Sequence, residues 1–205
     1  MMLLSAFIAF ILHFSFPSKN PDVAPPGTIR FQENKFIDAE VVTNWGWKEF
    51  LYCAKRDSSL EFYQAMLPDT SKIVNGRNYF NAPEFADKPV VGITHTQALI
   101  MCQWRSNMVS HGIIHPEKLC VSAQRDYAKY DKTLRVIYRL PQPEELKMVS
   151  EKPKKVKTAA NLEEITAVNN LVVENAFTSK VKEKKINTPA SLNRTFRCVA
   201  YFEKQ

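Results

Sequence analysis

The feature that most constrains this chain is an almost unbroken apolar run at its N-terminus, residues 1–16, with the sequence MMLLSAFIAFILHFSF. A polar, proline-rich stretch, PSKNPDVAPPGT, follows it. This order is typical of a secretory signal peptide, and the run is shorter than the roughly 20 residues that a membrane-spanning helix needs. We therefore expect residues 1–20 to be a signal peptide. An N-terminal anchor is the alternative, because no basic residue precedes the run and no small-x-small cleavage site is evident.

Export gives the cysteines a specific meaning. Thiols in an oxidising compartment such as the periplasm or the cell surface tend to pair, and the chain has four cysteines: Cys53, Cys102, Cys120 and Cys198. They allow three connectivities. None forms a CxxC motif and no spacing resembles a zinc site, so disulfides are expected rather than a metal centre.

Charge and composition exclude several other classes of function. The chain has a net charge of +7, but its basic residues are spread out, and the densest runs, EKPKKVK and KVKEKK, each contain a glutamate. Such runs are typical of a solvated surface, and we expect no nucleic-acid partner. Only five glycines occur, with no GxGxxG or phosphate-binding loop, which excludes the glycine-rich nucleotide sites.

One stretch, HGIIHPE, has the spacing of a metal-binding motif through His111, His115 and Glu117. Pro116 separates the second histidine from the glutamate, and the stretch has the character of a helix exit. The three groups therefore need not converge, and we expect no metal and no cofactor.

The N-terminal half alternates between short strands, a helix and coil. Residues 29–31 and 36–42 alternate apolar and polar side chains around QENK, which predicts a hairpin. Thr43 or Asn44 can cap a helix with the sequence WGWKEFLYCAKR. From residue 58 to 84 the chain has several turn signals and no periodicity. We expect this coil to be held by the aromatic residues Tyr79, Phe80 and Phe85.

A buried strand and a capped helix are predicted next. Residues 90–93 are apolar, and Thr94 with Gln97 forms a capping box. The following helix should turn one face inward, with His95 at its surface or acting as a cap rather than as a catalytic base. The residues expected on the inner face are Ala98, Met101, Cys102, Arg105 and Val109.

The C-terminal half begins with a polar insertion at residues 110–133. The sequence LRVIYRLPQPEELKMV then predicts a strand followed by a helix that starts at Pro143, with Glu144 and Glu145 at its positive end. The chain is long enough for one domain, expected over residues 21–205, and these elements leave it with a low content of helix and strand.

Four stretches carry a family resemblance: PPGTIRFQENKFIDAEVVTNWGWKEFL, FADKPVVGITHTQALIMCQWRSN, YRLPQPEELKMV and NRTFRCVAYF. In this order they resemble landmarks of the formylglycine-generating enzyme (sulfatase-modifying factor) family. The resemblance implies a compact, coil-rich α+β fold related to C-type lectins, with short antiparallel strands and two to four helices, and the low content of helix and strand noted above agrees with it. The matching residues are Val42, Thr43, Asn44, Pro89, Val90, Cys102, Trp104, Arg139, Leu140, Pro141, Glu145, Phe196, Arg197 and Cys198.

The resemblance also implies how the cysteines pair. It predicts a structural disulfide between Cys102 and Cys198, which closes a loop of about 97 residues and contributes on the order of 4 to 5 kcal/mol in the chain-entropy model. Cys53 and Cys120 are left over and form a second predicted pair.

The family's oxidases bind copper through two cysteines in a segment shortly before the final Phe-Arg-Cys. Here the corresponding residues, 151–194, are lysine-rich and contain no cysteine, tryptophan or glycine. Polar side chains cannot replace a thiolate pair as soft ligands for Cu(I), so no catalytic residues are expected. Leu162, Ile165 and Val168 have helical spacing and indicate that this segment folds back on the domain.

The sequence therefore favours a non-catalytic structural or interaction subunit of a bacterial cell-envelope complex. In kind it is similar to the gliding-motility and type IX secretion lipoproteins that carry this domain, and its expected partners are other envelope proteins. The alternative is a module that binds a small ligand or glycan on an aromatic platform of Trp45, Trp47 or Tyr79. Formylglycine-generating oxidase activity ranks last.

Overall fold

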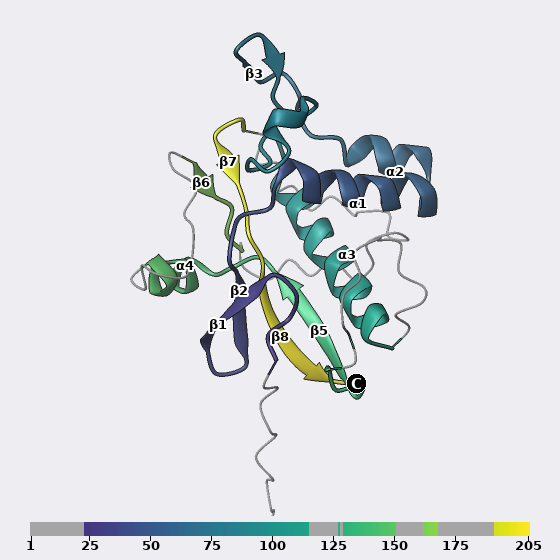
Figure 1. Ribbon diagram of the computed structural model, residues 1–205, viewed down its shortest axis with the longest axis vertical. Helices are drawn as coiled ribbons and strands as arrows, with labels where there is room; N and C mark the ends of the chain where they lie inside the picture. Colours follow the sequence, from purple (N-terminus) through teal and green to yellow (C-terminus); the bar gives the residue numbers. More distant parts are fainter. Residues whose placement is uncertain (1–22, 115–126, 128, 151–161, 168–190) are drawn as a thin grey trace, which may run out of the picture.

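The computed structural model describes residues 23–114, 127, 129–150, 162–167 and 191–205 (Figure 1). Its centre is a four-stranded antiparallel sheet in the order β1-β2-β8-β5. The strands are β1 (Thr28–Gln32), β2 (Lys35–Asp38), β8 (Val199–Lys204) and β5 (Leu134–Arg139). Together with the helices described below, this sheet confirms the expected α+β class. The ranges just given contain no helix long and apolar enough to cross a membrane, and the predicted signal peptide lies outside them.

Two smaller strand pairs accompany the sheet. β3 (Ile73–Val74) and β4 (Arg77–Asn78) form an antiparallel hairpin, which projects from the end of the molecule opposite β5 and β8 (Figure 1). β6 (Glu163–Glu164) pairs with β7 (Arg194–Thr195) in parallel. This pair is parallel and comes in addition to the expected antiparallel strands.

The predicted N-terminal hairpin is present as β1 and β2, but β2 ends at Asp38 instead of continuing to Val42. The chain leaves the sheet there and finds new backbone partners. The amide of Val42 donates to the carbonyl of Phe196 at 2.8 Å, and its carbonyl accepts from the amide of Val90 at 2.8 Å. Residues 39–42 keep the alternating pattern of a strand because they are paired with other segments and not with the sheet.

The first helix, α1 (Asn44–Asp57), is capped by Thr43, whose hydroxyl accepts from the amide of Gly46 at 3.1 Å. Asn44, the alternative cap, has a different role. Its buried side-chain amide donates to the carbonyls of Tyr79 and Phe85 at 3.1 and 2.9 Å. A short helix, α2 (Leu60–Ala65), follows and packs on α1. Asn44 thus ties the start of α1 to the coil that follows α2.

The long helix α3 (His95–Ile114) begins with the predicted capping box. The amide of Thr94 donates to Gln97 Oε1 at 2.7 Å, and the amide of Gln97 donates to Thr94 Oγ1 at 3.2 Å. The helix continues to Ile114, so the insertion predicted to start at residue 110 begins later. Ala98, Met101, Cys102 and Val109 are buried as expected, and the Arg105 side chain is largely covered, at 17% exposed.

The segment before α3 was predicted to be a strand over residues 90–93. Val90, Val91 and Ile93 are buried as expected, but the structure shows only two isolated bridges, Thr43 with Pro89 and Ile93 with Ser191. The strand prediction is therefore wrong. A short apolar run alone does not show whether a neighbouring strand is available to pair with it.

The sheet is covered on both faces, because successive side chains of a strand point to opposite sides. One face packs against α3, and its residues Phe36, Val136, Ala200 and Phe202 belong to the same core cluster as the buried residues of α1 and α3. The other face is smaller and packs against α4 (Pro143–Ser150) through Phe31, Ile37, Val199 and Val149. β5 and α4 confirm the predicted strand and helix of the C-terminal half.

The coil between α2 and α3 is held by side-chain amides as well as by the predicted aromatic residues. The rings of Tyr79 and Phe85 stack at 5.2 Å, with Phe85 in the short 3₁₀ helix η1 (Pro83–Phe85). Gln97 Nε2 donates to the carbonyls of Ala65 and Leu67 at 2.9 and 3.0 Å. These bonds satisfy backbone groups that a coil leaves without partners.

Residues 162–167 fold back on the domain, as predicted. Ile165 is buried, and its amide donates to the carbonyl of Thr195 at 2.8 Å. The local structure is β6 and not the helix that the spacing of Leu162, Ile165 and Val168 indicated. Val168 itself lies outside the described residues.

The structure predicts that Gly92 cannot be replaced. Its φ of +73° belongs to the left-handed region, and an added Cβ would lie 2.3 Å from the carbonyl oxygen of Asp69. We expect Gly92→Ala to lower the free energy of unfolding by more than about 2 kcal/mol, since backbone strain and overlap add. Gly76→Ala is the matched control: φ is +72° but the space is open, so its cost should be smaller, about 1 kcal/mol. Urea denaturation of both variants measures the difference, and equal costs would contradict the steric account.

Glu145 joins the start of α4 to the sheet. Its carboxylate accepts two bonds from the Arg139 guanidinium at 2.7 Å each and one from the amide of Gln142 at 2.9 Å. Lys35 Nζ lies 3.2 Å away. Burial raises the pKa of this carboxyl, but the bonds from Arg139 and Gln142 outweigh it and lower the pKa to about 2.

Because the folded pKa of Glu145 lies below its ordinary value of 4.5, its contribution to stability is complete above that value. It should be lost as the pH falls from about 4.5 to about 2, by at most about 3 kcal/mol. Unfolding free energies measured across this pH range should fall less steeply in Glu145→Gln. Glu144→Gln, at an exposed neighbouring position, should follow the wild-type curve. Parallel curves for the wild type and Glu145→Gln would contradict this assignment.

Candidate binding surface

The structure brings the two cysteines of the predicted disulfide together. Cys102 on α3 and Cys198 just before β8 are both buried, and their sulfur atoms lie 3.0 Å apart as free thiols. Burial raises the pKa of the Cys102 thiol, and the neighbouring Cys198 raises it further. A thiol held in its neutral form is a poor nucleophile and a poor metal ligand. The position suits a structural pair, and the covalent bond stays a prediction.

The structure describes only one cysteine of the second predicted pair. Cys53 on α1 is buried and disulfide-bonded. Cys120 lies outside the described residues, so the pairing of Cys53 with Cys120 also stays a prediction.

A buried ion pair adjoins the thiols. Asp38 Oδ2 accepts from Arg105 Nη1 at 2.7 Å and from the backbone amide of Cys198 at 2.8 Å. The Arg105 guanidinium lies 4.2 Å over the ring of Tyr138. Burial lowers the pKa of Arg105, but the Asp38 carboxylate more than offsets this effect and raises it. Arg105 therefore stays charged and its charge is compensated inside the protein.

His95 was expected at the surface or as a cap, and the structure corrects this. Its side chain is 4% exposed, and Nε2 lies 3.0 Å from the carbonyl of Thr166. Burial lowers its pKa, so the ring is neutral at physiological pH. His95 ties α3 to the segment containing β6, which lies 71 residues away along the chain and could not be foreseen from local sequence.

The histidine motif is also only partly described. His111 is exposed near the end of α3, whereas His115 and Glu117 lie outside the described residues. Within the part of the chain that the structure describes, no group of three or more His, Cys, Asp or Glu side chains could hold a metal ion.

The three residues suggested as alternatives for an aromatic platform differ in exposure. Trp47 is 0% exposed and Tyr79 is 8% exposed. Trp47 packs edge-on against Phe50 and Phe196 and donates its indole N–H to the carbonyl of Met66. Of the three residues proposed, only Trp45, at 58%, can present a ring to a partner.

A different aromatic and basic surface runs along α1. Trp45, Lys48, Tyr52 and Lys55 are spaced at i, i+3, i+7 and i+10, which places them on one side of the helix. This side is opposite the buried stripe of Trp47, Phe50, Leu51 and Ala54. Tyr52 is 63% exposed. The spacing was available in the sequence, but an exposed helix face has no apolar periodicity of its own to distinguish it.

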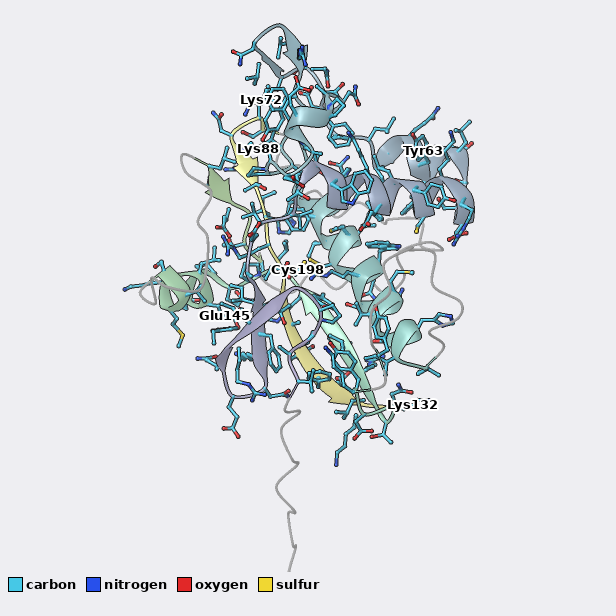
Figure 2. The ribbon with its side chains drawn as sticks, in the orientation of Figure 1. Tyr63, Lys72, Lys88, Lys132, Glu145 and Cys198 are labelled. Atoms are coloured by element: carbon cyan, nitrogen blue, oxygen red, sulfur yellow. The ribbon has the colours of Figure 1, made fainter. Side chains whose placement is uncertain are left out.

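Beside this helix face is a groove of about 440 Å³, which we call the α1 groove. Its floor is formed by Leu51 and Phe80 and its sides by aromatic and basic residues of α1, α2 and the following coil. Tyr63 of α2 lies on this side of the molecule (Figure 2). The lining residues are Lys48, Leu51, Tyr52, Lys55, Tyr63, Leu67, Pro68, Thr70, Phe80 and Asn81.

The α1 groove is electropositive, because its lining contains two lysines and no acidic residue. Lys48 Nζ lies 5.2 Å from the ring centroid of Phe80 and 3.4 Å from the carbonyl of Asn81. Lys55 Nζ lies 5.8 Å from the ring centroid of Tyr63. Neither lysine has a carboxylate partner within the described residues. Cations held over rings, and not neutralised, remain available to an anionic ligand.

The chain was compared with known proteins, and no family model, no curated protein and no solved structure matches it. The binding surface is therefore described from its own geometry.

The geometry of the cysteines generates a prediction about the oxidised protein. With their sulfur atoms already 3.0 Å apart, Cys102 and Cys198 should form a disulfide when the protein is produced in an oxidising compartment. Peptide mapping by mass spectrometry without reduction should recover this pair and the Cys53–Cys120 pair. Recovery of Cys102 linked to Cys53 or Cys120 would contradict the assignment, and so would free thiols at both positions in protein purified from the periplasm.

Proposed function

We propose that the chain is a non-catalytic interaction domain that binds an acidic segment of a partner protein in the α1 groove. The single observation that carries this proposal is a groove lined by aromatic rings and lysines with no acidic residue. Aromatic residues are enriched in protein interfaces, and a surface of one charge selects a partner of the other. Trp45 and Tyr52, exposed at 58% and 63%, extend the apolar contact along α1.

The expected envelope location belongs to the same proposal. It is supported by the N-terminal apolar run and by the thiol pair placed where the resemblance to the formylglycine-generating enzyme family implied a disulfide. In this proposal the chain keeps that family's framework for binding, and the partner is another protein of a bacterial envelope complex. Fractionation of cells that express the tagged full-length chain tests the location, and recovery in the cytosolic fraction would contradict it.

The test of binding uses a short fluorescent peptide in which glutamate and phenylalanine alternate, with a lysine–phenylalanine peptide of the same length as the control. We expect the acidic peptide to bind the purified protein with an affinity that falls as the salt concentration rises. The control peptide should not bind. Fluorescence anisotropy measures both.

Variants assign the binding to the groove. Charge reversal in Lys48→Glu together with Lys55→Glu should lower the affinity for the acidic peptide at least about tenfold. Tyr52→Ala should lower this affinity less, because only apolar contact is lost. The matched control is Lys132→Glu with Lys147→Glu, two exposed lysines away from the groove; Lys132 lies at the end of the molecule far from Tyr63 (Figure 2). Equal affinities of the two double variants would contradict the proposal.

A further inference from the structure

A second cavity, of about 420 Å³, adjoins α1 and shares no lining residue with the α1 groove. We call it the α1–α3 cavity, because Gly46 and Glu49 of α1 and Met101, Trp104, Arg105 and Met108 of α3 contribute to its walls. The chain between β2 and α1, from Asp38 to Thr43, forms a further wall. Its volume is that of a site for a small organic molecule.

The walls of the α1–α3 cavity are mostly apolar. Val42, Met101, Trp104 and Val109 are all buried residues of the main core that also line this space. Methionine side chains adapt to ligands of different shape. The cavity therefore fits a ligand with an apolar body.

The charged groups of the lining leave a negative site. Arg105 is the only basic residue in the lining, and it is already bonded to Asp38 at 2.7 Å and to the carbonyl of Pro26 at 2.9 Å. Glu49, one turn into α1 and half-buried, has no ion-pair or hydrogen-bond partner within the described residues. A cationic group in the ligand would complement the carboxylate of Glu49.

From these observations we infer that the α1–α3 cavity binds a small amine with an apolar chain. The ammonium group pairs with Glu49, and the apolar chain packs against Met101 and Val42. This site is independent of the α1 groove, since the two have opposite charge and lie on different sides of α1.

The probe is aminohexanol, titrated into the full-length protein labelled with ¹⁵N, with the indole N–H of Trp104 as the readout. We expect a saturable shift of this resonance. Hydroxyhexanoate, which has the same chain and the opposite charge, should not bind. Equal binding of aminohexanol and hydroxyhexanoate would overturn the inference, and so would an absence of binding to the folded wild type.

Two variants locate the ligand. Glu49→Gln should lower the affinity for aminohexanol roughly tenfold, because the charge-assisted hydrogen bond to the ammonium group is replaced by a neutral one. Gly46→Leu should abolish binding by filling the cavity. Gly46→Ala controls for folding, since its added Cβ makes ordinary contacts with Thr43 Oγ1 at 3.6 Å and Val42 Cγ1 at 3.8 Å. Unchanged affinity in Glu49→Gln would overturn the assignment. The Lys48→Glu and Lys55→Glu variant should bind aminohexanol like the wild type, which separates this site from the α1 groove.

Discussion

The buried carboxylate of Asp38 is the interaction on which the rest of the structure depends. It ends β2, holds Arg105 of α3 and receives the backbone amide of Cys198. The backbone of Asp38 also takes part, because its amide donates to Cys198 at 2.9 Å and its carbonyl accepts from Arg197 at 3.2 Å. Removing one partner of such a buried pair leaves an uncompensated charge in the core. Sheet, long helix and C-terminal segment therefore meet at one residue, which also bonds the backbone of Cys198.

Local patterns in the sequence predicted the elements well wherever one chain segment determines its own conformation. The capping box of Thr94 and Gln97, the start of α4 at Pro143 and the hairpin of β1 and β2 are of this kind. Errors arose where a distant segment decides the outcome. The His95 ring bonds to Thr166 of a distant segment, and residues 90–93 have only isolated bridges to other segments among the described residues. The sequence did not predict the α1 groove, because one side of the groove is a coil. The path of that coil depends on hydrogen bonds from Gln97 and Asn44.

Helix α1 lies between the two proposed binding sites, which have opposite charge. Its buried stripe of Trp47, Phe50 and Leu51 fixes the helix against α3 and the C-terminal segment. One exposed side then carries lysines and rings, and the other carries Gly46 and Glu49. Because α1 contributes residues to both sites, a ligand that shifted α1 would change the geometry of both. The two proposed sites differ in chemistry but share this helix.

The serines of α3 have a consequence for how the sheet meets other molecules. Ser106 and Ser110 accept from the amides of Tyr138 and Val136 at 2.7 and 3.0 Å, which are the amides that β5 turns away from β8. At the opposite margin, β1 carries a register shift between Arg30 and Gln32. Helix hydroxyls on one border and a bulge on the other discourage strand addition and edge-to-edge aggregation. These features favour recognition of the chain through its side chains over the addition of a foreign strand to this sheet.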